Sequence, residues 1–280
     1  MNVLSLFDGM SCGQIALNRA GIKYDNYYAS EIKTHAIKVT QNNYPDTKQL
    51  GSVTSLLNID WRVSKIDLLI GGSPCQDFSI LNKNILGLDG KKSGLFWEYF
   101  RVLKEIQKVN PEVKFLLENV KMKKEHEKQI TDLLQVEPIF IDSKLVSAAH
   151  RKRLYWTNIG GGQIQQPKDK GIKLQDILES GYVSRDKSVC IVKNYARSVQ
   201  SSNKDSFIKM CESRSRKGFL TVVYEEENNK NSVRLFNRNE LEALQTIPKG
   251  YTDCVNYYDC ADLIGDGWTV DVIAHIFSYL

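Results

Sequence analysis

The sequence predicts an α/β fold with a mostly parallel central sheet. Residues 3–7, 66–70 and 113–117 are short apolar runs of the kind that form buried strands. Segments with helical spacing of apolar residues lie between these runs, which is the order of βαβ units. In such units the carboxyl ends of the strands share one edge of the sheet, so we expect ligands there.

Length and composition are those of an ordinary soluble protein. The chain has 280 residues, 42% apolar and 25% charged, enough for one domain with an insertion or for two domains. Its six cysteines show no Cys-x-x-Cys spacing, which favours a reducing cytosol over a disulfide scaffold and predicts no metal site. No apolar run approaches the ~20 residues of a membrane span, and the start lacks a signal sequence. We therefore expect a cytoplasmic protein without membrane contact.

The positive charge is concentrated in one segment. The whole chain carries a net charge of +5, whereas residues 181–220 hold nine Lys or Arg against three Asp or Glu, a local +6. The remainder is nearly neutral, so any contact with an anionic partner is expected in this segment.

The first strand, residues 3–7, leads into a glycine-containing turn and a helix that Gly21 ends. Such a turn lets a ligand approach the backbone and the helix N-terminus. A tight turn without a ligand is an equally good interpretation of this segment alone. The spacing of Gly9 and Gly13 differs from the dinucleotide fingerprint, which argues against a nicotinamide cofactor.

A second strand over residues 26–30 ends in Glu31. This acid lies a little over 20 residues beyond the first turn, where α/β nucleotide binders place a carboxylate on the ribose hydroxyls. A solvated glutamate is the alternative. Residues 51–53 then begin a further strand-to-helix turn.

The strand over residues 66–70 ends at Gly71-Gly72, and Pro74 stiffens the loop that presents Cys75. A thiol attacks only as the thiolate, so the site should also supply positive charge or oriented N–H groups. Taken alone, Cys75 is more simply read as a core residue. Residues 77–92 have little periodicity and could form a mobile active-site loop, after which a helix begins near Ser93.

The strand over residues 113–117 delivers Glu118, a carboxyl group that is costly there unless it is paired or protonated. Arg151 and Arg153 alternate before another apolar strand, so they could point together into a cleft or form a solvated basic turn. We interpret His150 as structural.

The chain is expected to divide into three parts. Residues 1–158 form the core, residues 159–235 a small lobe rich in basic and hydroxyl side chains, and residues 236–280 a segment that returns to the core. That last segment is predicted to contain a helix over 239–245 and a terminal helix from Val270.

Together these residues carry a resemblance: the chain resembles a cytosine-C5 DNA methyltransferase. The family's motifs occur in order as Phe7-Asp8-Gly9, Glu31, Gly71-Gly72-Ser73-Pro74-Cys75, Glu118-Asn119-Val120, Arg151-x-Arg153 and Gly265-Asp266-Gly267-Trp268. The residues of these motifs are similar to those in the catalytic domain of animal de novo DNA methyltransferases. The compact size and the Lys/Asn-rich composition are more like a bacterial or phage enzyme, in a bacterial cytosol or an infected host.

The resemblance implies a Rossmann-like S-adenosylmethionine-dependent methyltransferase fold and transfer of a methyl group to carbon 5 of a flipped-out cytosine in double-stranded DNA. Cys75 would add to carbon 6 as a thiolate. Glu118, protonated or sharing a proton, would hydrogen-bond the ring. Arg153 would hold the O2 oxygen, with Arg151 supporting it.

The implied donor is S-adenosylmethionine, which leaves as S-adenosylhomocysteine. By resemblance the donor site comprises Phe7, Gly9, Met10, Ser11, Cys12, Gly13, Glu31, Ile32, Val53, Gly72 and Trp268. Ser52 departs from the family, which usually has Asp there on the adenine amine, and weaker donor binding is a possible consequence. Asp266 is a lesser departure.

The lobe over residues 159–235 matches the family's target-recognition region by position. The basic residues expected to contact DNA are Lys193, Arg197, Arg214, Arg216 and Lys217. The resemblance also allows a restriction endonuclease as partner, in a restriction–modification pair, and a monomeric state. Two alternatives stay open: a cytosine-C5 methyltransferase acting on transfer RNA, and a catalytically silent DNA-binding module.

Overall fold

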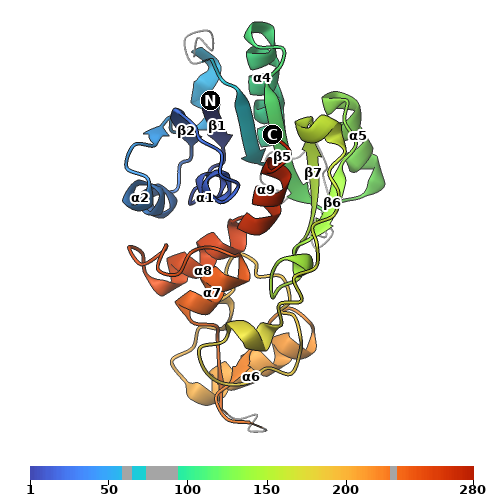
Figure 1. The fold of residues 1–280 in the computed structure, drawn as a ribbon. Coiled ribbons are helices and arrows are strands. Elements are labelled where there is room, and N and C mark those ends of the chain that lie inside the picture. The colour runs from blue at the N-terminus through green and yellow to red at the C-terminus, as the bar shows by residue number, and fades with distance from the viewer. Residues whose placement is uncertain (59–64, 74–93, 228–231) are drawn as a thin grey trace. The chain divides into compact units, whose positions relative to one another are not determined.

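The computed structural model describes residues 1–58, 65–73, 94–227 and 232–280 (Figure 1). It confirms the predicted α/β class, with a central sheet of strand order β3-β2-β1-β4-β5-β7-β6. The strands are β1 (Asn2–Leu6), β2 (Asn26–Ser30), β3 (Lys48–Gln49), β4 (Leu68–Gly72), β5 (Lys114–Val120), β6 (Ile139–Asp142) and β7 (Lys152–Thr157). Pairing from β3 through β5 is parallel, whereas β7 runs antiparallel to β5.

Helices connect the strands of the sheet and make up much of the rest of the chain. The connecting helices are α1 (Cys12–Arg19), α2 (Thr34–Asn43), α4 (Gly94–Val109) and α5 (Lys124–Leu134). Later in the chain come α6 (Lys204–Arg216), α7 (Arg238–Leu244), α8 (Tyr257–Asp266) and α9 (Val270–Phe277), with a small ribbon of β8 (Val223–Tyr224) and β9 (Val233–Arg234).

The chain divides into two compact units. The first comprises Met1–Ile141, Lys152–Gln166 and Ala274–Leu280, and the second comprises Asp142–Arg151 and Pro167–Ile273. This division does not follow the predicted borders after residues 158 and 235: the first unit extends to Gln166, and most of the C-terminal segment belongs to the second unit.

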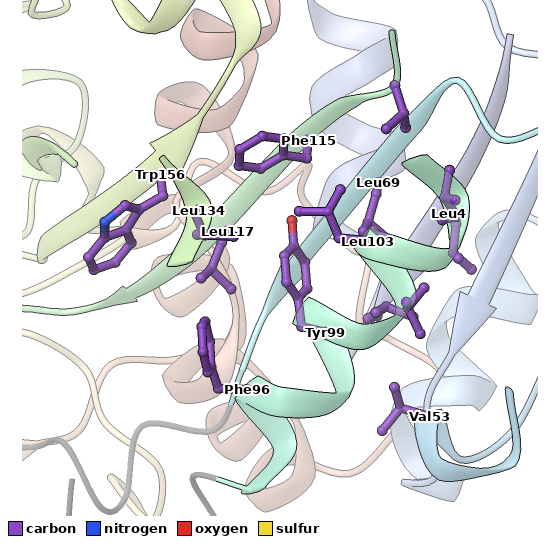
Figure 2. Close-up of a cluster of buried hydrophobic side chains, with 14 of the residues drawn as sticks. Leu4, Val53, Leu69, Phe96, Tyr99, Leu103, Phe115, Leu117, Leu134 and Trp156 are labelled. Atoms are coloured by element: carbon purple, nitrogen blue, oxygen red, sulfur yellow. The ribbon is translucent and has the colours of Figure 1, made fainter. Parts of the chain in front are cut away.

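The core of the first unit lies between the sheet and α4 (Figure 2). Phe96, Tyr99 and Leu103 come from one face of α4, as their helical spacing predicts, and pack with Leu69 and Leu117 of the sheet. The hydroxyl of Tyr99 is buried and has no hydrogen-bond partner among the residues that the structure describes. This burial raises the pKa of Tyr99 well above its ordinary value.

A glycine allows α1 to lie close to the opposite face of the sheet. A Cβ atom on Gly13 would lie 2.5 Å from Cδ1 of Ile70 and 2.6 Å from the hydroxyl oxygen of Tyr27. A side chain at this position would have to displace the ends of the Ile70 and Tyr27 side chains. Gly13 therefore leaves room for these two side chains beneath the first turn of α1.

Buried carboxylates organise the second unit. Glu240 is fully buried in α7 and accepts from both terminal nitrogens of Arg234, at 2.7 and 2.8 Å. Glu242, also fully buried, accepts from the backbone N–H groups of Gly250 and Thr252. Because a buried carboxylate is stable only when its oxygens are satisfied, these bonds tie α7 to the neighbouring segments.

Two kinds of feature are absent from the described ranges. No helix within them combines the length and hydrophobicity needed to cross a membrane. No group of three or more His, Cys, Asp or Glu side chains in the same ranges is arranged to hold a metal ion.

Candidate active site

Four strand ends of the first unit meet at one edge of the sheet. Parallel register pairs Leu6 with both Ser30 and Gly71, and pairs Gly72 with Glu118. The segments that follow β1, β2 and β4, and the end of β5, therefore lie next to one another, as the βαβ pattern predicts.

The turn after β1 has an unusual backbone. Phe7, Gly9 and Ser11 have φ values of +57°, +61° and +64°. The left-handed region costs a non-glycine residue about 1–2 kcal/mol, so Phe7 and Ser11 hold this turn in a strained shape. The N–H of Gly9 donates to Oε2 of Glu31 at 2.8 Å, which links the turn to the end of β2.

Glu31 is held rigidly by the backbone. Its side chain is largely buried, and Oε1 accepts from the N–H groups of Ile32 and Lys33 at 2.8 and 2.9 Å. Oε1 thus accepts two hydrogen bonds and Oε2 accepts one, so the lone pair left on Oε2 can accept a further bond from a hydroxyl group. Ile32 follows with its side chain 70% exposed, open to contact by a flat apolar group.

Other residues of the expected donor site are placed differently. Met10 and Cys12 are buried. Val53 is buried at the start of a short 3₁₀ helix, η1 (Val53–Asn58). Trp268 belongs to the second unit.

Ser52 is already engaged by its neighbour. Its hydroxyl lies 2.8 Å from the Thr54 hydroxyl and accepts from the Thr54 N–H at 3.3 Å. This local turn engages the hydroxyl that stands in place of the family's usual carboxylate, and weaker contact to the donor stays a prediction.

Asp8, in the turn after β1, was not among the expected site residues. Its Oδ1 accepts from the Tyr27 hydroxyl at 2.8 Å, while Oδ2 is buried without a hydrogen bond from the described residues. Burial raises the pKa of Asp8 to about 6, although nearby hydroxyl groups lower it and the charge of Glu31 raises it further. In the sequence, the signal that could have identified Asp8 is its position between an apolar strand and a glycine.

Glu118 and Arg153 form a close ion pair at the end of β5. Arg153 Nε lies 2.7 Å from Glu118 Oε1, and both side chains are largely buried. The antiparallel pairing of β5 with β7 sets Arg153 beside Val120, two residues from Glu118. This brings together two of the four expected catalytic residues, one carboxylate and one guanidinium.

Asn119 fixes the chain just ahead of the expected nucleophile. Its side-chain Nδ2 donates to the hydroxyl of Ser73 at 3.1 Å and to the Ser73 carbonyl at 3.4 Å. Its Oδ1 accepts from the Val120 N–H at 2.8 Å. Cys75 itself and the expected 77–92 loop lie outside the described residues. Ser73, two residues before Cys75, is thus anchored beside Glu118.

Arg151 has partners different from those of Arg153. Its guanidinium donates to the carbonyls of Ile191 and Gly265 at 3.1 and 3.2 Å, all within the second unit. The shared orientation inferred from alternation is therefore not supported by these contacts, because Arg151 precedes β7 and turns into its own unit. His150 contacts Asp142 at 3.1 Å, the structural role that was expected.

The expected DNA-contacting residues all lie in the second unit. Arg197 is paired there with Asp259 at 2.8 Å and Asp262 at 3.0 Å, so its charge is already balanced by α8. Lys193, Arg216 and Lys217 are exposed, and Arg214 is half-buried. The acidic partners of Arg197 are more than 60 residues away in sequence, which is why local charge could not indicate the pairing.

The sheet order, the glycine turn and the acid at the end of β2 define the class of Rossmann-like methyltransferase folds. Comparison with known proteins agrees. The solved structure of the Schizosaccharomyces pombe Dnmt2 methyltransferase superposes with a TM-score of 0.69 at 18% identity, covering 99% of this chain and 97% of that one.

At the level of sequence, the family model of the C-5 cytosine-specific DNA methylases matches residues 1–137. The type II methyltransferase M.NgoBV of Neisseria gonorrhoeae is 29% identical over 206 residues, 64% of this chain and 46% of the relative. The orphan methyltransferase M.SPRI of Bacillus phage SPR is 31% identical over 195 residues, 65% of this chain and 43% of the relative.

Residues 1–137 of the chain therefore match the C-5 cytosine-specific DNA methylase family. Each match covers less than half of the curated relative's length.

Proposed function

We propose that this protein transfers a methyl group from S-adenosylmethionine to carbon 5 of a flipped-out cytosine in double-stranded DNA, through a covalent adduct with Cys75. The observation that carries the proposal is the buried Glu118–Arg153 pair, with Nε and Oε1 2.7 Å apart, beside the anchored segment that leads to Cys75. The description of the matching family model supports DNA as the substrate, and the bacterial and phage sources of the relatives support a bacterial cell as the setting.

The residues of the first unit suit each step of this chemistry. The Cys75 thiolate forms a bond to carbon 6, and the ring electrons move toward N3 and O2. Glu118 would hydrogen-bond the N3 edge, and the guanidinium of Arg153 would offset negative charge developing at O2. Carbon 5 would then take the methyl group while S-adenosylhomocysteine leaves. Loss of the carbon-5 proton to water would re-form the double bond between carbons 5 and 6, expel the Cys75 sulfur as a thiolate and restore the aromatic ring.

The donor site fits S-adenosylmethionine at Glu31, whose carboxylate is fixed by three backbone N–H groups and keeps a lone pair on Oε2 for a ribose hydroxyl. Ile32, with its 70% exposed side chain, would pack against the adenine. When bound, the donor supplies an electrophilic methyl group on a sulfonium. The backbone around Gly9 would face its methionine part.

Arg151 and the second unit have supporting roles in this proposal. Arg151 would act as a positioning residue, because its guanidinium holds the carbonyls of Ile191 and Gly265. Lys193, Arg216 and Lys217 are exposed cations that would meet DNA phosphates. A restriction endonuclease partner and a monomeric state are further parts of the proposal.

The decisive experiment measures methyl transfer from labelled S-adenosylmethionine to duplex DNA, together with covalent trapping on DNA containing 5-fluorocytosine. Cys75→Ser should abolish both signals. Glu118→Gln should slow methylation by roughly 10²-fold or more, the general scale for a proton-handling group. Cys254→Ser, a free cysteine of the second unit, is the matched control and should retain the wild-type rate.

Ordinary turnover by Cys75→Ser would overturn the mechanism. Methyl incorporation into transfer RNA but not into duplex DNA would overturn the substrate and favour the RNA alternative. If the wild type methylates DNA, bisulfite sequencing of plasmid from expressing cells identifies the recognition sequence.

A further inference from the structure

Helix α6 (Lys204–Arg216), in the second unit, carries four basic side chains against two acidic ones. Asn203 caps its N-terminus by accepting from the Ser206 N–H at 2.9 Å. Cys211, fully buried, anchors the helix against the unit. Lys204, Lys209 and Arg216 are exposed, so much of the local positive charge lies on this one helix.

A polar groove runs along α6. Hydroxyl groups of Ser198, Ser206 and Ser213 line it, and Lys209 and Arg214 supply two cations. Asp205 is the acidic member of the lining. Nε of Arg214 is buried and has no hydrogen-bond partner among the residues that the structure describes. Hydroxyl donors with two cations are the chemistry that binds a phosphodiester group.

The end of α6 holds an aromatic ring in solvent. The N–H of Gly218 donates to the Ser215 carbonyl and that of Phe219 to the Arg214 carbonyl, both at 3.0 Å. With Gly218 at φ +73°, these two bonds are a Schellman motif. Phe219 thus has a fixed backbone, yet its side chain is 52% exposed.

Helix stability alone does not explain this arrangement. Cations in the last turn favour the helix dipole, which accounts for Arg214 and Arg216. An apolar residue after the capping glycine usually packs back on the helix, which does not account for a Phe219 side chain that stays 52% exposed. An anionic partner with flat apolar faces would use all of these groups at once, and a nucleic acid has both features.

We propose that α6 and its C-terminal cap are a DNA-contact surface of the second unit, on which Lys209 and Arg214 bind backbone phosphate and Phe219 packs against a base step. This inference rests on the proposed function and adds Lys209 and Phe219 to the contacts expected from sequence. Arg197 is excluded from the surface's phosphate contacts because Asp259 and Asp262 hold it.

The test measures binding of fluorescent duplex DNA by anisotropy at salt concentrations from about 50 to about 250 mM, the range over which binding through phosphate contacts weakens steeply. Lys209→Gln and Arg214→Gln should each weaken binding and reduce the slope of log K against log salt by about 1. Phe219→Ala should weaken binding about five- to fifty-fold with little change of slope, and Phe219→Trp should retain binding.

The chain offers matched controls in the first unit. Lys128→Gln removes an exposed cation from α5, and Phe140→Ala removes a ring that is 41% exposed on β6. Both should leave DNA binding unchanged. Melting temperatures and binding of S-adenosylhomocysteine confirm that each variant is folded.

Different outcomes contradict the proposed α6 surface and the proposed function. If the wild type methylates DNA while Lys209→Gln, Arg214→Gln and Phe219→Ala bind it as the wild type does, the α6 surface is wrong and the proposed function stands. If the wild type neither binds nor methylates duplex DNA, the proposed function fails. If the three variants lose affinity for transfer RNA alone, the assignment of the surface to DNA is overturned.

Discussion

Asp8 is the residue whose environment most opposes its charge. The carboxyl is buried in the turn after β1 beside the charge of Glu31, and no ion pair with a basic side chain forms among the described residues. Its pKa rises from 3.8 to about 6 in the folded protein. Ionised Asp8 therefore lowers the free energy of unfolding, and the strained backbone of Phe7 and Ser11 lowers it further.

The sign of the pH dependence follows from that shift. Above about pH 6 the folded and unfolded chains both carry ionised Asp8, and the burial cost is fully present. As the pH falls through 6 toward 3.8, the folded form takes up the proton first and the cost disappears. Asp8→Asn keeps an acceptor for the Tyr27 hydroxyl and removes the charge.

We expect Asp8→Asn to raise the free energy of unfolding at pH 8 by about 1–3 kcal/mol, since one pKa unit corresponds to about 1.4 kcal/mol. The gain should shrink toward zero near pH 4. Thermal melts at both pH values measure it, with Asp46→Asn on the surface as the control. A gain of equal size at both pH values would show that the charge of Asp8 is not its cause.

At the same scale, residue chemistry could be predicted where it depended on local sequence. Glu118 and Arg153 were recognised because each adjoins an apolar strand, and the structure pairs them. The sequence could not predict that Arg151 bonds to other groups than Arg153 does, because its partners Ile191 and Gly265 are distant in sequence. The anchoring of Ser73 by Asn119 likewise depends on the register of β4 with β5.

Elements followed the sequence where they have a strong apolar period. Strands β1, β2, β4 and β5 and helix α4 were predicted from their runs, and α7 from its apolar residues. Helices α2 and α6 were not, because they bury few residues, and α8 was missed although it buries five of its ten residues. Asn256 with Asp259 three residues later was a capping signal that could have located α8, since Asn256 accepts from the Asp259 N–H. The antiparallel pairing of β7 with β5 has no local sequence signal.

Gly265 controls how closely α8 approaches the 190–193 segment. A Cβ atom there would lie 2.4 Å from the carbonyl carbon of Val192 and 2.5 Å from the amide nitrogen of Lys193. Both atoms belong to the backbone, so neither can move aside as a flexible side chain could. The Gly265 carbonyl also accepts from Arg151, which makes this approach part of the packing of the second unit.

Gly265→Ala should therefore destabilise the second unit by more than about 3 kcal/mol, as expected for overpacking against backbone. Chemical denaturation followed by circular dichroism measures the loss. Gly171→Ala is the matched control: it also lies in the second unit, at φ +67° with no atom near its Cβ. It should cost only about 1 kcal/mol of backbone strain. Equal losses in the two variants would contradict the role of close approach.

At the scale of the whole molecule, nearly all of the proposed donor contacts lie in the first unit, whereas the proposed DNA surface lies in the second. Donor binding should then stabilise the protein without DNA. A ligand that binds only the folded state at 100 times its Kd adds about 2.7 kcal/mol, or about 5–10 °C in Tm for a chain of this size. S-adenosylhomocysteine, the expected product, should produce such a shift.

The variants separate donor binding from methyl transfer. Glu31→Gln should lose most of the shift, because the carboxylate that would bind a ribose hydroxyl becomes an amide with one acceptor oxygen fewer. Glu118→Gln should keep it, since Glu118 is proposed to act on the cytosine alone. Differential scanning fluorimetry with and without the ligand measures both. If the wild type shows no shift at saturating ligand, the donor assignment is wrong. If the two variants lose it equally, Glu31 has no special part in it, because a general loss of fold would then explain both.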